Sequence, residues 1–150
     1  MLKFRFARPS DLGRLVQINI GQETSYRKLN ERMFREIIPQ KRVLCALQDR
    51  EVVALLYWCK EFLGRTNQWY LEQITVEANY RNQGCGVTLL RYFLKYAKKR
   101  KTEKVFADIH NDNIASLKMS LAAGALISGF IEGIGKTKMK DERVIVRFEL

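Results

Sequence analysis

The sequence predicts a mixed α/β fold in one domain over residues 1–150, and three observations support this prediction. The length of 150 residues is that of an ordinary domain, and no linker or internal repeat interrupts the chain. Apolar residues make up 47% of the chain and aromatic residues 11%, which is enough to form a buried core. Strand-like and helix-like patterns alternate, and two strand–helix–strand crossovers in the middle imply some parallel strand pairing.

Seven stretches have the pattern of β-strands. The first alternates apolar and basic residues, and the others are short runs rich in apolar side chains. The second and third are separated by Asp49, Arg50 and Glu51, which is typical of a hairpin turn. The predicted strands cover residues 2–8, 43–48, 52–59, 69–76, 105–110, 125–133 and 143–150.

Four stretches have the apolar spacing of amphipathic helices. They cover residues 12–20, 24–38, 86–99 and 113–123. Ser10 precedes the first helix and is expected to be its N-cap, because a serine side chain accepts a hydrogen bond from the first turn. Pro39 ends the second helix, and Gly124 is a suitable C-cap for the last.

The chain is strongly basic, with a net charge of +11 and an isoelectric point near 9.8. This balance suits an anionic partner such as nucleic acid, a phosphorylated cofactor or a membrane surface, but a solvated basic face explains it equally well. The densest cluster covers residues 98–104, where a helix is expected to end and cations complement the helix dipole. Because no RNP-like, helix-turn-helix or zinc-finger pattern is present, we do not expect a nucleic-acid partner.

The three cysteines, Cys45, Cys59 and Cys85, lack the spacing of a metal or disulfide site, and His110 is the only histidine. We therefore expect no metal and a reducing, cytoplasmic location. No apolar run reaches the ~18 residues of a membrane span, and the first residues lack the apolar core of a secretory signal. A membrane partner is therefore not expected.

Gly84 and Gly86 stand one residue apart at a predicted strand-to-helix junction, a place where proteins often bind phosphate. A Walker loop would need the pattern GxxxxGK[ST], which the sequence lacks. A dinucleotide fingerprint would need a third glycine where Leu89 stands. The remaining pattern, Arg81-x-x-Gly84-x-Gly86, lets successive backbone N–H groups approach an anion at a helix N-terminus, so we expect a diphosphate.

This loop resembles the acetyl-CoA signature of the GNAT N-acetyltransferase superfamily. Residues 81–87 read RNQGCGV and follow the strand-end residues Ile74-Thr75-Val76. The family pattern continues with Asn113 at a strand end and Ser116 on the next helix, and Gly124-Ala125 stands where the family usually has Gly-Phe. The resemblance covers nearly the whole chain. It implies a mixed, mostly antiparallel sheet with splayed central strands, flanked by about four helices.

The resemblance implies that acetyl-CoA is the cosubstrate and that no metal is needed. In the family the end of the fourth strand pairs with the pantetheine arm, the glycine loop holds the pyrophosphate, and a strand-end asparagine contacts the pantetheine. The cofactor-binding residues implied here are Ile74, Thr75, Val76, Arg81, Asn82, Gln83, Gly84, Cys85, Gly86, Val87, Asn113 and Ser116. Direct attack in this family favours a filling role for Cys85 over a reactive one.

The function that the resemblance implies is acetyl transfer from acetyl-CoA to an amine, by direct attack in a ternary complex. The acceptor amine belongs to a small molecule or to a protein. The alternative is a non-catalytic acyl-CoA-binding sensor or interaction module on the same fold. A monomer and a homodimer are both compatible with the apolar final strands.

Three residues are candidates for the proton transfers. Glu72 and Asp108 are equally good candidates for the base that deprotonates the amine, because family members place a base on either strand. Ser120 stands where the family commonly has a tyrosine acid, and its hydroxyl is far less acidic than a phenol. Either Ser120 holds a water or the thiolate leaves unassisted. Further groups with suitable chemistry are His110, which shares a strand face with Asp108, and Tyr70, Tyr80 and Tyr92.

The family builds its acceptor site from the early helices and the last hairpin loop, here residues 20–34 and 133–143. Lysines in the loop would attract an acidic acceptor, whereas glutamates in the helical segment would hold an amine. These residues are Lys136, Lys138, Lys140, Glu23 and Glu31. The two signals conflict, so the sequence leaves the acceptor open.

Overall fold

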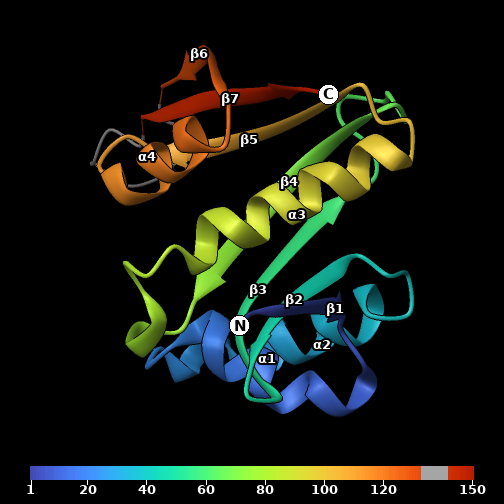
Figure 1. Cartoon of the computed structure of the whole chain (residues 1–150), viewed down its shortest axis with the longest axis vertical. Helices are drawn as coiled ribbons and strands as arrows, with labels where there is room; N and C mark the ends of the chain where they lie inside the picture. The colour runs from blue at the N-terminus through green and yellow to red at the C-terminus, as the bar shows by residue number, and fades with distance from the viewer. Residues whose placement is uncertain (133–141) are drawn as a thin grey trace. The chain divides into compact units, whose positions relative to one another are not determined.

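The computed structural model describes residues 1–132 and 142–150 (Figure 1). The strands are β1 (Lys3–Phe6), β2 (Val43–Gln48), β3 (Glu51–Cys59), β4 (Gln68–Val76), β5 (Lys104–His110), β6 (Leu126–Ile131) and β7 (Arg143–Glu149). The α-helices are α1 (Leu12–Ile20), α2 (Arg27–Ile37), α3 (Cys85–Lys99) and α4 (Ile114–Ala122). Short 3-10 turns cover Pro9–Asp11, Thr24–Tyr26 and Ala78–Tyr80.

The strands form a seven-stranded sheet in the order β1-β2-β3-β4-β5-β7-β6. The pairs β1–β2, β2–β3, β5–β7 and β6–β7 are antiparallel, and β4–β5 is parallel. The predicted mixed, mostly antiparallel α/β fold with about four helices is therefore confirmed. The chain groups into two compact units, Met1–Trp58 with Gln73–Tyr92 and Cys59–Glu72 with Phe93–Leu150. That residues 1–150 form a single domain stays a prediction.

The first unit, Met1–Trp58 with Gln73–Tyr92, contains the predicted hairpin. β2 and β3 pair in antiparallel register and are joined by Asp49 and Arg50, whose φ angles are 49° and 72°. Two-residue hairpin loops need this left-handed backbone, because only then does the turn match the twist of the strands. The hairpin expected from the sequence is thus present.

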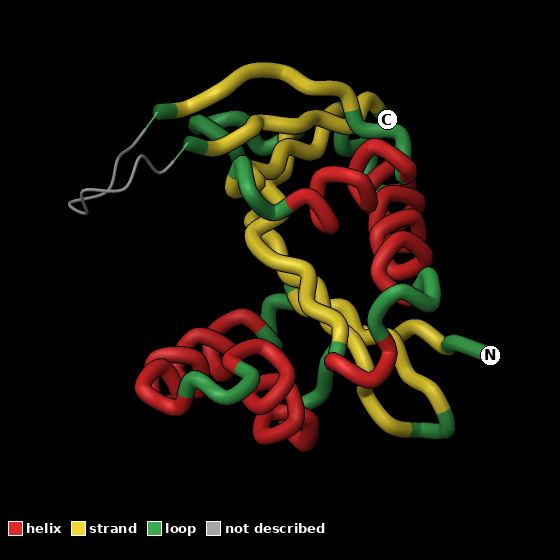
Figure 2. The backbone as a smooth tube through the Cα atoms, turned by 90° about the vertical axis from the view of Figure 1, so that its left-hand side faces the viewer, coloured by secondary structure: helices red, strands yellow, loops and turns green. Residues whose placement is uncertain are grey.

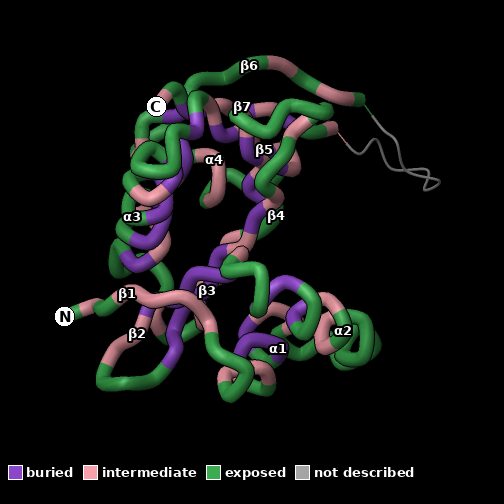
Figure 3. The backbone as a smooth tube through the Cα atoms, turned by 90° about the vertical axis from the view of Figure 1, so that its right-hand side faces the viewer, coloured by how far each residue is buried: buried purple, intermediate pink, exposed green. Residues whose placement is uncertain are grey.

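One core of the first unit lies between α1, α2 and the β2–β3 hairpin. α1 and α2 lie side by side (Figures 1 and 2), and β2 and β3 are largely buried (Figure 3). The buried apolar residues of this cluster are Leu15, Val16, Ile18, Phe34, Ile37, Ile38, Val43, Cys45, Val52 and Leu55. Their burial, worth ~1.5–3 kcal/mol for each large side chain, holds α1 against β3.

Ser10 is not the N-cap of α1, which corrects one expectation from the sequence. Ser10 lies inside the 3-10 turn Pro9–Asp11, and Asp11 accepts the hydrogen bond from the N–H of Arg8 at 2.7 Å. Asp11 also accepts two hydrogen bonds from the Arg5 guanidinium, at 2.6 and 3.0 Å. A charged carboxylate held by an arginine is a stronger acceptor than a serine hydroxyl, so the turn forms around Asp11.

The second unit, Cys59–Glu72 with Phe93–Leu150, has one apolar and one polar sheet face. Alternate residues of β5 and β7 are buried, as the period of a strand requires. On this apolar face Trp69 packs against Phe93 and Tyr96 of α3, with ring centroids 6.3 and 5.9 Å apart. The opposite face, called the polar face here, carries Tyr70, Glu72, Asp108, His110 and Arg143.

Of the two predicted crossovers, one gives a parallel pair. The crossover through α3 joins β4 to its parallel neighbour β5. The crossover through α4 joins β5 to β6, but β7 lies between these strands and pairs antiparallel with both. The final hairpin therefore prevents a second parallel pair.

β4 and β5 pair in parallel register near the start of each strand. The register of β4 with β5 runs from Gln68↔Lys104 to Tyr70↔Phe106, although the two strands continue to Val76 and His110. Among the described residues, the later parts of these two strands are not in register with each other.

In the part of the chain that the structure describes, none of the helices has the length and apolar character needed to cross a membrane.

Candidate functional site

The glycine loop of the first unit presents unpaired backbone N–H groups at the start of α3. The N–H of Thr88 donates to the carbonyl of Gly84 at 3.1 Å, closing the first turn. Asn82 and Gly84 have φ angles of 60° and 77°, a left-handed backbone that glycine adopts without strain. Within the described ranges, the N–H groups of residues 85–87 have no acceptor, as is normal at a helix N-terminus.

These donors fit a diphosphate. A Cβ built on Gly84 would meet no atom within 4 Å, so open space lies next to the loop backbone. Unpaired N–H groups at a helix N-terminus bind anions, and alternating backbone handedness directs several of them to one point. The unpaired N–H groups of residues 85–87 are therefore donors of the kind that a phosphate group accepts from.

One peptide group at the end of β4, in the first unit, makes hydrogen bonds through both its carbonyl and its N–H. The carbonyl of Val76 accepts a hydrogen bond from Nε of Arg81 at 3.0 Å. The N–H of Glu77 donates to the carbonyl of Val53 at 2.9 Å. Because successive N–H groups of an extended chain point to opposite sides, the N–H of Val76 points away from Val53. This is the orientation that a ligand beside the strand end would need.

A chain of side-chain hydrogen bonds links the end of β4 to both helices of the first unit. The Thr75 hydroxyl accepts from Nε2 of Gln73 at 3.2 Å and donates to Oδ1 of Asn19 on α1 at 3.3 Å. Nδ2 of Asn19 donates to Oδ1 of Asn30 on α2 at 2.6 Å. Nδ2 of Asn30 donates to the carbonyl of Tyr26 at 3.0 Å, so the chain ends at the turn before α2.

The two carboxylates considered as bases both lie on the polar face of the second unit. Glu72 is exposed, and its Oε1 accepts a hydrogen bond from the thiol of Cys59 at 3.1 Å. Asp108 is more enclosed, with 18% of its side chain exposed. Its Oδ2 lies 2.6 Å from Nη1 of Arg143, and its Oδ1 accepts a hydrogen bond from the Tyr70 hydroxyl. Both oxygens of Asp108 are thus engaged.

The three residues of the second unit near α4 have different surroundings. Oδ1 of Asn113 accepts a hydrogen bond from the N–H of Ser116 at 3.1 Å, so Asn113 caps α4. Ser116 is half-buried, whereas Ser120 is buried with only 3% of its surface exposed. Position 120 carries a hydroxyl and no phenol, so the tyrosine acid of the family has no equivalent at this position.

The tyrosines and the histidine with suitable chemistry have structural contacts. Tyr92 stacks on Phe4 within the first unit, with ring centroids 4.6 Å apart. Tyr70 donates to Asp108 and stacks on Phe62 in the second unit. His110 lies on the polar face like Asp108, and its Nδ1 is 2.6 Å from Oδ1 of Asp112. Tyr80 lies in the 3-10 turn before the glycine loop.

Burial of the Cys85 side chain determines its chemistry. Only 4% of Cys85 is exposed, and this burial raises the pKa of its thiol. A helix N-terminus would otherwise lower a thiol pKa. Desolvation prevails because a thiolate in an apolar setting loses its hydration. That Cys85 fills space rather than reacts stays a prediction.

The acceptor-site candidates are only partly described. Residues 133–141, with Lys136, Lys138 and Lys140, lie outside the described residues. In the first unit, Glu23 accepts hydrogen bonds from the hydroxyl and the N–H of Ser25 at 2.5 and 3.3 Å. These hydrogen bonds lower the pKa of the Glu23 carboxyl. Glu31 is half-buried on α2. In the part of the chain that the structure describes, no group of three or more His, Cys, Asp or Glu side chains is placed to bind a metal.

The predicted residues fall into two groups, one in each unit. The first unit contains Ile74, Thr75, Val76 and residues 81–87. The second unit contains Glu72, Asp108, Asn113, Ser116 and Ser120. Sequence reasoning missed Arg14, Asn19 and Glu77, whose side chains contact one another or the end of β4. No local signal could have found them, because Arg14 and Glu77 are 63 residues apart.

Comparisons with known proteins show the family and the fold of this chain. The sequence pattern of the acetyltransferase (GNAT) family matches residues 14–124. A ribosomal-protein-alanine N-acetyltransferase from Brucella melitensis has a similar fold, with 21% identity, coverage of 99% of each chain and a TM-score of 0.82. A GNAT-family acetyltransferase from Bacillus cereus has 23% identity, coverage of 99% of this chain and 97% of that chain, and a TM-score of 0.82.

A third similar structure was solved with a bound cofactor. It is a candidate acetyltransferase from Salmonella typhimurium with its cofactor acetyl-CoA, and it has 15% identity to this chain. The alignment covers 99% of this chain and 94% of that one, with a TM-score of 0.82. A comparison with curated proteins finds no match. At these sequence identities the similar structures show that the fold is shared. The family pattern covers most of the chain, and the chain therefore belongs to the acetyltransferase (GNAT) family.

Proposed function

We propose that this protein transfers the acetyl group of acetyl-CoA to an amine, by direct attack of the amine in a ternary complex. The observation that carries the proposal is the set of unpaired N–H groups at the start of α3, next to a glycine with open space beside it. The same loop lies inside the stretch that matches the acetyltransferase family. A cytoplasmic location belongs to the same proposal.

Each part of the cosubstrate has residues to hold it. The unpaired N–H groups of the glycine loop at the start of α3, those of residues 85–87, hold the diphosphate. The backbone of residues 74–76 pairs with the pantetheine arm, and the family resemblance assigns Asn113 and Ser116 to the same cosubstrate. When bound, acetyl-CoA supplies an activated acetyl group attached to a good leaving thiolate.

The residues of the chain then serve the transfer in three ways. The N–H of Val76 donates to the carbonyl oxygen as that oxygen gains negative charge. A carboxylate on the polar face, Glu72 or Asp108, accepts the proton of the attacking amine. Ser120 is not suited to protonate the thiolate, because its hydroxyl is a weak acid and is buried. Because a thiol has a pKa of about 8.5, the thiolate leaves without a strong acid.

Calorimetric titration with CoA and acetyl-CoA tests the cofactor site. Binding by the wild-type protein is expected, and Gly86→Val should weaken it about tenfold or more, because each hydrogen bond to a charged group is worth ~1.5–3 kcal/mol. Gly129→Val is a matched control, since a Cβ at Gly129 meets no atom within 4 Å and the residue lies on β6. If the wild-type protein binds neither ligand, the proposal is wrong.

The second candidate is a non-catalytic acyl-CoA binder, and the buried Ser120 at the position of the family's tyrosine favours it. A thiol-release assay over a panel of small amines and N-terminal peptides separates the candidates. Thiol release that depends on an amine supports the enzyme. Tight CoA binding without release by any member of a broad panel supports the binder.

A further inference from the structure

We propose that Arg14 is a positioning residue for the acetyl-CoA site. From α1 it holds Glu77 and thereby orients the last peptide groups of β4. This proposal rests on the proposed function, because it assumes that residues 74–76 pair with the cosubstrate. All the contacts that carry it lie within the first unit.

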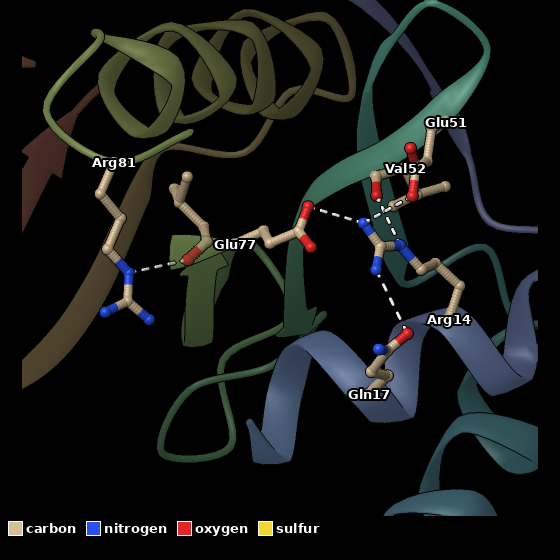
Figure 4. A network of polar contacts seen from close by, with 7 residues as sticks. Arg14, Gln17, Glu51, Val52, Glu77 and Arg81 are labelled. Atoms are coloured by element: carbon tan, nitrogen blue, oxygen red, sulfur yellow. Dashed lines mark hydrogen bonds and ion pairs between the residues drawn. The ribbon is translucent and has the colours of Figure 1, made fainter. Parts of the chain in front are cut away.

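The Arg14 guanidinium connects three segments of the first unit (Figure 4). Nη2 lies 2.6 Å from Oε2 of Glu77 and 2.9 Å from Oε1 of Glu51. Nε donates to the carbonyl of Val52 at 3.0 Å, and Nη1 donates to Oε1 of Gln17 at 3.2 Å. The side chains of Arg14 and Glu77 are only 21% and 26% exposed, so solvent screens this pair less than a surface pair.

These contacts restrain the residue that follows β4. The peptide group between Val76 and Glu77 is held by Arg81 on its carbonyl side and by Val53 on its N–H side. Arg14 adds a third restraint, on the Glu77 side chain. The peptide group after Val76 is planar and is held in place. The direction of the Val76 N–H, which belongs to the preceding peptide group, can therefore change only through the φ and ψ angles of Val76.

α1 also restrains the residue on the other side of Val76. Asn19, on the same helix as Arg14, accepts a hydrogen bond from the Thr75 hydroxyl at 3.3 Å. Both neighbours of Val76 are thus tied to one helix, Thr75 through Asn19 and Glu77 through Arg14. α1 is itself held in the core by Leu15 and Val16, both fully buried. The helix therefore provides a rigid support for the strand end.

Loss of Arg14 has two consequences that act in the same direction. Glu51 and Glu77 both contact Nη2 of Arg14, so without the guanidinium two carboxylates face each other and repel. The strand end then shifts away from the orientation that it now has. Glu77 also precedes the glycine loop, and its uncompensated charge repels a diphosphate. We expect weaker CoA binding from both effects.

The experiment compares Arg14→Met, Glu77→Ala and the double variant by calorimetric titration with CoA. Arg14→Met should weaken binding about fivefold or more, within the usual range for coupling between two sites. Glu77→Ala removes the same restraint without leaving an uncompensated carboxylate, so it should weaken binding less, by about threefold. The double variant should bind no more weakly than Arg14→Met, because both substitutions remove the same contact. Hydrogen exchange should rise in peptides that cover residues 74–87.

Asp11→Ala is the matched control, because it breaks a partly buried arginine–carboxylate pair of the first unit that contacts neither β4 nor the glycine loop. It should lower the melting temperature but leave the dissociation constant for CoA within about twofold of the wild-type value. Equal weakening by the control would show a general loss of stability and overturn the proposal. Should Arg14→Met not fold, Glu77→Ala alone decides.

The outcomes distinguish the two proposals. If the wild-type protein does not bind CoA, the proposed function fails, and the role of Arg14 fails with it. If the wild-type protein binds CoA and the variants bind it equally well, the cofactor site stands and only the positioning role is overturned. Selective weakening by Arg14→Met and Glu77→Ala supports both.

Discussion

Arg143 and Asp108 form an ion pair on the polar face of the second unit, with Nη1 and Oδ2 2.6 Å apart. The other carboxylate oxygen of Asp108 accepts the hydrogen bond of Tyr70. Asp108 is also the more enclosed of the two candidate bases, with 18% of its side chain exposed, whereas Glu72 is exposed. We therefore expect an amine to reach Glu72 more readily and take Glu72 as the base, a choice that the sequence left open.

Glu72→Gln should consequently lower kcat more than Asp108→Asn does. A general base contributes ~10²–10⁴-fold, so Glu72→Gln should lose a factor in this range, whereas Asp108→Asn should keep kcat within about tenfold. Asp108→Asn should instead lower the melting temperature, because Arg143 loses a charged partner. Steady-state kinetics on an amine identified by the thiol-release panel decide the matter. A larger loss of kcat for Asp108→Asn would reverse the assignment.

The hydrogen-bond chain from Thr75 through Asn19 to Asn30 should contribute to stability. Asn19→Ala leaves the Asn30 side chain and the Thr75 hydroxyl without their partner and should cost ~1–3 kcal/mol of unfolding free energy. Thr75→Val removes the hydroxyl at one end of this hydrogen-bond chain. The double variant of Asn19→Ala and Thr75→Val should be more stable than the sum of the two single losses of unfolding free energy predicts. Urea denaturation measures these values. Strict additivity would show that the hydrogen bond between Thr75 and Asn19 contributes nothing.

The thiols should react in the order of their exposure. Cys45 and Cys85 are buried, and burial raises the pKa of the Cys45 thiol to about 12 and also raises the pKa of the Cys85 thiol. At pH 7.5 each therefore holds less thiolate than an exposed cysteine, and labelling should be slow until the pH rises or the protein unfolds. Alkylation followed by peptide mass spectrometry should modify the half-buried Cys59 first.

Activity of a Cys85 variant provides the complementary test. Cys85→Ala should keep kcat close to the wild-type value, because the thiol fills space and the amine attacks directly. A loss of the size expected for Glu72→Gln would instead indicate an acyl-enzyme on Cys85.

The stability that Asp11 contributes should depend on pH. The hydrogen bond from Arg5 holds the pKa of the Asp11 carboxyl below its ordinary value, with further help from the N–H of Arg8. A carboxyl group whose pKa is lower in the folded state than in the unfolded state stabilises the fold at pH values above its unfolded-state pKa of about 3.9. This stabilisation is lost as the pH falls through the pKa of the folded state. Asp11→Asn should therefore cost about 1 kcal/mol at pH 7 and much less near pH 2.

Thermal unfolding of both proteins from pH 2 to pH 8 measures this difference. A melting-temperature gap between wild type and Asp11→Asn that stays constant over the whole range would show that the Asp11 charge is not responsible.

Much of the fold followed from local sequence signals. The hairpin at Asp49 and Arg50, the end of α2 before Pro39 and the start of α3 after Gly84 each depend on backbone preferences within a few residues. Ser10 shows the limit of such signals, because it lies inside a 3-10 turn whose acceptor, the Asp11 carboxylate, is held by Arg5 on another element. The second crossover shows the same limit, since β7 comes after it in the chain and yet separates β5 from β6.

The resemblance of the glycine loop to the GNAT signature implied acetyl-CoA. By itself the sequence determined the strands and helices and the glycine loop at the start of α3. These features depend on neighbouring residues, whose φ and ψ preferences and apolar period are written in the chain. Only the tertiary structure decided which charges meet. It joined Arg14 to Glu77 across 63 residues and Arg143 to Asp108 across 35 residues. An ion pair depends on distance in space, which folding sets and sequence separation does not reveal.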